Sequence, residues 1–106
     1  METLTQLTIE NVKEKIKENP KVFLVFYSAW IGLWQSYSKI IKEMEEEYTD
    51  FVFLTVNLSD QLDFQKEFPV TSVPTSFLYK NGNLILRKTG LIKKPELMDI
   101  IDRAGM

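Results

Sequence analysis

Residues 70–83 read VTSVPTSFLYKNGN and contain the strongest structural signal in the chain. The dipeptide Asn81-Gly82 separates two segments, TSFLYK and NLILRKT, that are rich in apolar residues. Asn-Gly between such segments favours a two-residue turn that joins antiparallel strands. The sequence therefore predicts a hairpin of strands at 75–80 and 83–89.

The segments before this hairpin alternate between strand and helix patterns. KVFLVFY at 21–27 and FVFLTVN at 51–57 are short apolar runs, typical of strands that are covered on both faces. A short, polar segment at 2–6 is expected to form a further strand. Apolar residues at helical spacing predict helices at 8–18, 34–48, 60–67 and 95–104, with Asn19-Pro20 ending the first and Pro95 beginning the last. Strand–helix alternation requires parallel pairing and the hairpin requires antiparallel pairing, so a mixed sheet with helices on both faces is predicted.

Length and composition indicate one soluble globular domain, residues 1–106. Of the 106 residues, 44% are hydrophobic and 26% are charged, and the formal net charge is −2. This charge gives no reason to expect a nucleic acid or an anionic membrane as partner. No apolar segment approaches the roughly 20 residues that span a bilayer, and METLTQLTIE lacks the pattern of a signal peptide. A cytoplasmic location is expected.

The chain contains no cysteine and no histidine. Thiol chemistry, disulfides and zinc sites of the usual kind are therefore excluded, and the commonest general base at neutral pH is missing. The acidic residues do not follow a metal-binding loop pattern, and the acidic run at 43–47 is interpreted as the solvated face of a helix. The sequence predicts no metal and no cofactor.

Four landmarks along the chain together resemble the thioredoxin family. They are WIGLW at 30–34, VNLSD at 56–60, VTSVPTSFLYKNGN at 70–83, and Gly90 ahead of KKPELMDIID. The resemblance covers nearly the whole chain and implies the α/β thioredoxin fold, with a central five-stranded mixed sheet flanked by four helices in a single domain.

The resemblance fails at the redox centre. Thioredoxins have W-C-G-P-C where this chain has Trp30-Ile31-Gly32-Leu33-Trp34, so Ile31 and Trp34 occupy the cysteine positions. A buried aspartate of many family members aligns with Val25. No catalytic residue is predicted, because exchange of thiols and disulfides requires a thiolate nucleophile.

The resemblance also implies a substrate groove. In the family the proline before the hairpin strand is cis, which assigns a cis bond to Val73–Pro74. Val73 would then offer its backbone N–H and C=O to an extended peptide. The expected groove comprises Trp30, Ile31, Gly32, Leu33, Trp34, Ser72, Val73, Pro74, Gly90, Leu91 and Ile92.

Three functions are compatible with this pattern. The preferred one is a redox-inactive module that binds an extended polypeptide segment of another protein and exists as a monomer or a weak homodimer. The second is an engineered or diverged, cysteine-free form of a thioredoxin disulfide oxidoreductase that acts in cell redox homeostasis. The third is a structural or oligomerisation domain. Trp30 is interpreted as family scaffold and Ile31 as facing solvent or a partner, whereas Trp34 fits a buried and a surface position equally.

Overall fold

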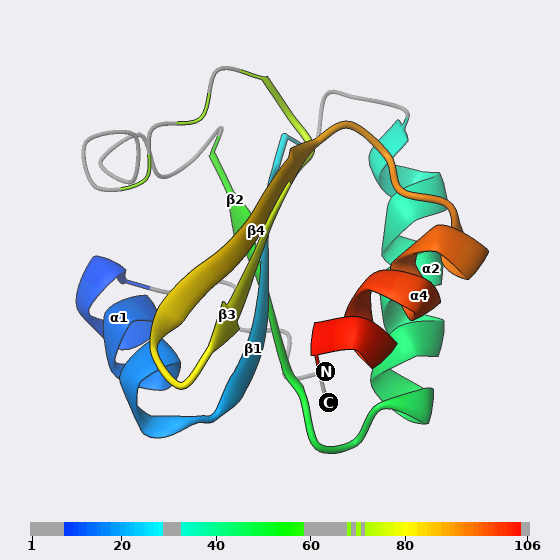
Figure 1. Cartoon of the computed structure of the whole chain (residues 1–106). Helices are drawn as coiled ribbons and strands as arrows, with labels where there is room; N and C mark the ends of the chain where they lie inside the picture. Colours follow the sequence, from blue (N-terminus) through cyan, green and yellow to red (C-terminus); the bar gives the residue numbers. More distant parts are fainter. Residues whose placement is uncertain (1–7, 29–32, 59–67, 69, 71, 105–106) are drawn as a thin grey trace.

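The computed structural model describes residues 8–28, 33–58, 68, 70 and 72–104 (Figure 1). Within this part, one sheet has the strand order β2-β1-β3-β4. The elements are α1 (Ile9–Glu18), β1 (Lys21–Tyr27), α2 (Leu33–Glu47), β2 (Val52–Asn57), β3 (Thr75–Lys80), β4 (Asn83–Thr89) and α4 (Lys94–Ala104).

The predicted mixed sheet is confirmed. Strand β1 pairs in parallel with β2, from Val22 opposite Val52 to Tyr27 opposite Asn57. On its other side β1 pairs antiparallel with β3. A parallel pair needs a long crossover, which α2 provides between β1 and β2.

The hairpin of β3 and β4 has the predicted bounds. Asn81 and Gly82 both have positive φ angles, 53° and 82°, as a type I′ turn requires. The pairing shifts between Leu78 and Tyr79, because Leu78 lies opposite Leu86 whereas Tyr79 lies opposite Leu84. Ile85 is therefore the extra residue of a β-bulge in β4.

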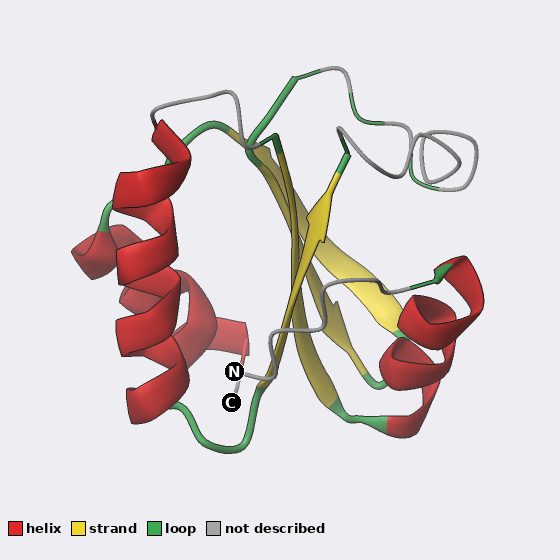
Figure 2. Cartoon of the chain, turned by 180° about the vertical axis from the view of Figure 1, so that it is seen from behind, coloured by secondary structure: helices red, strands yellow, loops and turns green. Residues whose placement is uncertain are grey.

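Helices cover both faces of the sheet. Figures 1 and 2 show α1 on one face and α2 with α4 on the other. The alternation of side chains along β1 divides the core accordingly. Leu24 and Phe26 belong to the cluster that includes Val12 and Ile16 of α1, whereas Phe23 and Val25 belong to a second cluster. That second cluster contains Tyr37, Ile41 and Met44 of α2 and Leu97 and Ile101 of α4.

Helices α1 and α4 each begin or end at a recognisable local signal. The Thr8 side chain accepts a hydrogen bond from the Asn11 backbone N–H at 3.0 Å, and Asn19 ends α1 in an extended conformation. Helix α4 begins at Lys94, one residue earlier than predicted, so Pro95 is the second helical residue. This position suits proline, because the first backbone N–H groups of a helix have no intrahelical partner.

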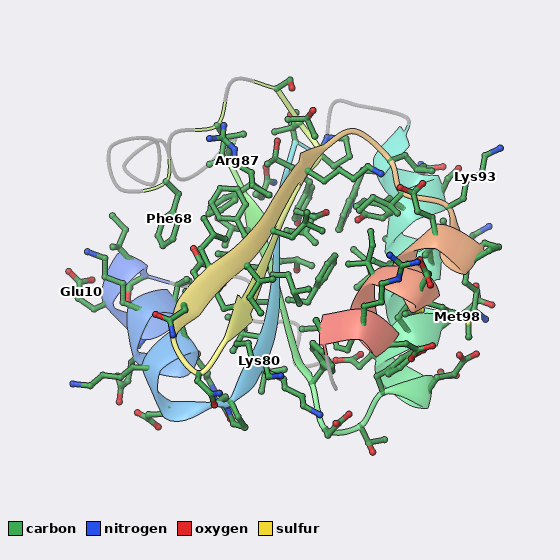
Figure 3. The ribbon with its side chains drawn as sticks, viewed as in Figure 1. Glu10, Phe68, Lys80, Arg87, Lys93 and Met98 are labelled. Carbon is green, nitrogen blue, oxygen red and sulfur yellow. The ribbon has the colours of Figure 1, made fainter. Side chains whose placement is uncertain are left out.

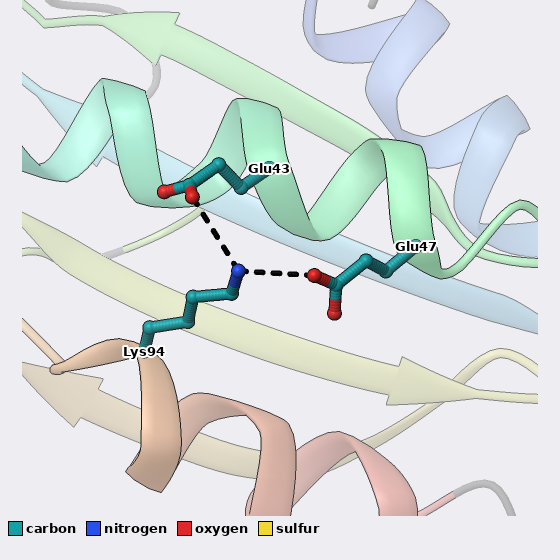
Figure 4. Close-up of polar contacts among 3 residues, drawn as sticks. All are labelled: Glu43, Glu47 and Lys94. Atoms are coloured by element: carbon teal, nitrogen blue, oxygen red, sulfur yellow. Dashed lines mark hydrogen bonds and ion pairs between the residues drawn. The ribbon is translucent and has the colours of Figure 1, made fainter.

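The ends of α2 and α4 are joined by polar contacts at the surface. The Lys94 ammonium lies 2.9 Å from the Glu47 carboxylate and 3.4 Å from that of Glu43 (Figure 4). The hydrogen bond to Glu47 and the nearby Glu43 raise the pKa of Lys94. In addition, the Tyr48 hydroxyl donates to the Asp102 carboxylate at 2.7 Å. Such exposed contacts orient the two helices more than they stabilise them.

The prediction of five strands and four helices is met in part, because four strands and three helices lie within the described residues. The strand expected at 2–6 and the helix expected at 60–67 lie outside them. Where the sequence predicts a strand at 51–57 and a helix at 34–48, the structure has Val52–Asn57 and Leu33–Glu47. These differences of one residue are usual at the ends of elements.

Candidate functional site

The expected groove lies at the end of the sheet where β1 leads toward α2 and β3 begins. Of the residues that replace the family motif, Trp30, Ile31 and Gly32 lie outside the described residues. Leu33 is the first residue of α2, and its side chain also lies outside the described part. The described part of the site therefore consists of Trp34, the residues around it, and the two loops that carry Ser72 to Pro74 and Gly90 to Ile92.

Trp34 is half-buried and its ring contacts those of two tyrosines. Its ring stacks on that of Tyr27, with centroids 3.9 Å apart and planes 9° from parallel. The rings of Trp34 and Tyr37 form an edge-on pair, with centroids 6.4 Å apart and planes at 86°. Offset and edge-on aromatic pairs of this kind stabilise by about 0.5–1.5 kcal/mol each beyond the area they bury. The sequence fits both a buried and a surface position for Trp34. In the structure its ring packs on the core and part of its surface stays accessible.

Beneath Trp34 lies a buried polar pair. The Tyr37 hydroxyl and the Ser76 hydroxyl are 2.6 Å apart, and both residues are buried. Burial raises the pKa of Tyr37 to about 12, and the hydrogen bond to Ser76 opposes this effect in part. Ser76 lies directly opposite Val25 across β1 and β3. The position of the family's buried acid is therefore occupied by an apolar side chain beside two neutral hydroxyls.

The loop before β3 is fixed by two hydrogen bonds. The Val73–Pro74 peptide bond is cis. The Gly90 N–H donates to the Pro74 carbonyl at 2.7 Å, and the Thr75 hydroxyl donates to the Ser72 carbonyl. Gly90 has a φ of +89°, which a glycine adopts without strain. These contacts join the loop before β3 to the loop after β4.

Val73 differs from its neighbours in this loop. Within the part of the chain that the structure describes, neither its backbone N–H nor its C=O has a hydrogen-bond partner. Its side chain is half-buried and packs on the core cluster of the α1 face. Ser72 beside it is exposed. The backbone N–H and C=O of Val73 are therefore a donor and an acceptor that no other described residue uses.

The residues after Gly90 differ in how far they are buried. Ile92 is 1% exposed and belongs to the core cluster with Leu97 and Ile101. Pro74 is also buried, whereas Leu91 is half-buried. The Ile92 side chain therefore fills space under α4, and the place of Ile92 in the groove stays a prediction. The accessible described residues of the groove are Trp34, Ser72, Val73, Gly90 and Leu91.

No group of three acidic residues close enough to hold a metal ion is found in the described part of the chain. Among the same residues, no helix has the length and apolar character needed to cross a bilayer.

Comparison with known proteins identifies the family. The sequence profile described as "Thioredoxin" matches residues 3–103. Thioredoxin H4-1 of Oryza sativa subsp. japonica is 34% identical over 92 residues, which cover 83% of this chain and 70% of the rice protein. The chain belongs to the thioredoxin family. The thioredoxin of Buchnera aphidicola is 26% identical and aligns over 96% of both chains.

Solved thioredoxins share its fold. Mitochondrial thioredoxin 3 of Saccharomyces cerevisiae superimposes with a TM-score of 0.81 at 27% identity, over 90% of this chain and 89% of the yeast chain. The oxidised thioredoxin of Plasmodium falciparum gives a TM-score of 0.82 at 23% identity, over 93% and 94% of the two chains. This thioredoxin-family chain keeps the fold and has no cysteine.

The first prediction concerns redox activity. This thioredoxin-family chain is expected to reduce insulin disulfides in the presence of dithiothreitol no faster than buffer does, because it has no thiol. The double variant Ile31→Cys/Trp34→Cys should exchange only slowly, since Val25 supplies no buried acid and the Tyr27 stack on residue 34 is lost. The measurement is the rate of insulin precipitation with protein purified from a host that lacks its own thioredoxin. Wild-type turnover above the buffer rate would contradict the prediction.

Sequence reasoning missed two features of the site. The sequence pattern places Tyr27 at the end of the strand expected at 21–27 and Tyr37 within the helix expected at 34–48, and it predicts no contact of either ring with Trp34. A buried tyrosine hydroxyl requires a partner, and Ser76 is the buried serine on the strand that α2 covers. The need of a buried hydroxyl for a partner, together with the alternation of side chains along β3, could have predicted the Tyr37–Ser76 pair.

Proposed function

We propose that this thioredoxin-family protein is a redox-inactive module that binds an extended polypeptide segment of another protein. The observation that carries the proposal is the backbone of Val73, which lacks a hydrogen-bond partner among the described residues. An extended peptide that pairs with an exposed backbone segment gains main-chain hydrogen bonds, while neighbouring pockets select its side chains.

The loop geometry supports this mode of binding. Ser72 and Pro74, on either side of Val73, have carbonyls that already accept hydrogen bonds from Thr75 and Gly90. The loop is therefore held in place before any partner arrives. A preorganised binding segment loses little conformational entropy on association, which favours affinity.

Apolar contacts would supply the remaining affinity. Trp34 and Leu91 are half-buried, and Ile31 stands in the sequence where the family has its nucleophile. Burying one large apolar side chain contributes roughly 1.5–3 kcal/mol. Two such anchors would contribute about 3–6 kcal/mol, and backbone hydrogen bonds would add to this against the entropic cost of association. The partner is thus captured by burial, where a thioredoxin with cysteines forms a covalent intermediate.

The second prediction tests this proposal. A random library of linear peptides displayed on phage is expected to yield binders, and Ile31→Asp should weaken their binding at least tenfold, because a charge would replace an apolar contact. The free energy of unfolding of the variant should stay within about 0.5 kcal/mol of the wild type. Binding is measured by fluorescence anisotropy of labelled peptides and stability by urea unfolding.

The matched control is Ile85→Asp, the same change at a side chain that is 49% exposed on β4. It should leave peptide binding unchanged. N-methylation of the peptide residue that faces Val73 should weaken binding, because it removes a backbone hydrogen bond. Equal binding by the two aspartate variants would refute the proposal, and a large loss of stability in Ile31→Asp would show that Ile31 is structural.

A further inference from the structure

A second candidate site lies at the other end of the sheet. A cavity of about 350 Å³ opens between α1 and the β3–β4 hairpin. Because β3 runs from Thr75 to Lys80, this cavity and the loop of Val73 are at opposite ends of the strand. Figure 3 labels Phe68 on the same side of the sheet as α1. The cavity is lined by Lys13, Ile16, Lys17, Phe68, Tyr79, Asn81 and Gly82.

The inner part of this cavity is apolar. Ile16 and Phe68 are 8% and 7% exposed, and the half-buried ring of Tyr79 packs on the same core cluster. Such a surface excludes water from one face of a planar ring placed on it. The volume lies at the small end of the range that small-molecule sites occupy, about 300–1,000 Å³.

Two lysines and a tyrosine hydroxyl lie among the residues that line this cavity. Lys13 and Lys17 are four residues apart and so share one side of α1, and none of the described residues that line the cavity is acidic. Lys17 has no ion-pair partner within the described part of the chain. The Tyr79 hydroxyl likewise has no hydrogen-bond partner there, and burial raises the pKa of Tyr79 to about 12, so it remains a donor at neutral pH.

We propose that this cavity binds a small molecule that combines an aromatic ring with one anionic group, a carboxylate or a phosphate. The ring would lie on Ile16, Phe68 and Tyr79. The anionic group would be held by the Lys17 ammonium and the Tyr79 hydroxyl. The site is separate from the peptide groove and does not depend on the function proposed for it.

The test uses the whole chain and three probes with the same ring: 2-naphthoate, 2-naphthyl phosphate and the neutral 2-naphthamide. Binding is followed by ¹H–¹⁵N NMR titration near neutral pH. Saturable shifts are expected for the amides around Ile16, Tyr79 and Gly82. The anionic probes should bind at least about tenfold more tightly than the amide, because a charge-assisted hydrogen bond is about twice as strong as a neutral one. The stronger of the two anionic probes identifies the natural anionic group as a carboxylate or a phosphate.

Variants separate this cavity from other surfaces. Lys17→Gln should weaken binding of the anionic probes about fivefold to tenfold and leave that of 2-naphthamide unchanged. Lys39→Gln makes the same change at an exposed residue of α2. Neither this variant nor Ile31→Asp should alter the binding of the anionic probes or of 2-naphthamide. Wild-type-like spectra of the free variants exclude misfolding as the cause. The proposal is overturned if no probe binds, if all three bind equally, or if Lys39→Gln weakens binding as much as Lys17→Gln.

Discussion

Val25→Asp, which introduces the acid of many thioredoxins at its family position, is expected to lower the free energy of unfolding by about 2.5–6 kcal/mol. Val25 is 0% exposed and lies in the core cluster with Tyr37 and Leu97. The change removes a buried apolar side chain, worth about 1.5–3 kcal/mol, and buries a carboxyl group at a further cost of about 1–3 kcal/mol. Urea unfolding monitored by tryptophan fluorescence measures the loss.

The pH dependence of this loss identifies its cause. Burial raises the pKa of the introduced carboxyl in the folded state above its unfolded value. The unfolded chain therefore ionises first as the pH rises, and the variant should be less stable at about pH 8 than at about pH 5 relative to the wild type. Val25→Asn should show a loss without this pH dependence, and Val25→Ala only the loss of apolar burial.

The opposite outcome is also informative. Wild-type stability of Val25→Asp at both pH values would show that the hydroxyls of Tyr37 and Ser76 stabilise a carboxylate beside them, which contradicts the prediction. The expected result instead means that restoring the redox centre requires repacking under α2, in addition to two new cysteines.

The second large effect is expected at alkaline pH and depends on Tyr37. Its folded pKa of about 12 lies above the ordinary value of 10.0 because the hydroxyl is buried. Below about pH 10 the Tyr37 hydroxyl is protonated in both the folded and the unfolded protein, so it does not change the free energy of unfolding with pH. Between about pH 10 and 12 the hydroxyl ionises in the unfolded chain alone, which lowers the free energy of unfolding. Two pKa units correspond to about 2–3 kcal/mol. Urea unfolding at several pH values measures the effect. Between about pH 10 and 12, the free energy of unfolding of the wild type should fall by about 2–3 kcal/mol more than that of Tyr37→Phe.

The two stability curves are expected to cross. Near neutral pH, Tyr37→Phe should be about 1–3 kcal/mol less stable than the wild type, because the Ser76 hydroxyl is left buried without its partner. Near pH 12 the variant should be at least as stable. Adding Ser76→Ala to Tyr37→Phe should recover most of the loss at neutral pH. Parallel curves for wild type and variant would contradict the buried position of this hydroxyl.

Tyr48→Phe provides the matched control for these curves. The hydrogen bond to Asp102 raises the pKa of Tyr48 to about 12, but the two groups lie at the surface. Water screens such a contact, so its removal should change the alkaline slope much less than Tyr37→Phe does.

The hairpin and the mixed sheet could be predicted because their signals are local. Asn81-Gly82 sets the turn by itself, and the bounds of β3 and β4 follow from it. The buried stripe of α2 was predictable for the same reason, since Tyr37, Ile41 and Met44 recur at helical spacing and are all 0% exposed.

The geometry of the site depends on contacts between distant residues and was predicted less well. The stack of Trp34 on Tyr27 requires a particular rotation of α2 over the end of β1, which no local pattern sets. The Tyr37–Ser76 bond joins residues 39 positions apart. The resemblance to the family places Ile92 in the groove, and in the structure its side chain packs in the core beneath α4.

The bulge in β4 has a consequence for how this protein behaves in a crowded solution. Among the described strands, β4 pairs with β3 alone and forms an edge of the sheet. Its side chains Leu84 and Ile85 are 52% and 49% exposed, so this edge strand is partly apolar. A straight edge of this kind is a template on which strands of other molecules add and aggregates grow. The extra residue Ile85 breaks the regular ladder at this point, so an incoming strand cannot pair along the whole length of β4. Deleting Ile85 would remove the bulge and leave β4 able to pair with another strand along its whole length, so the variant is expected to precipitate more readily.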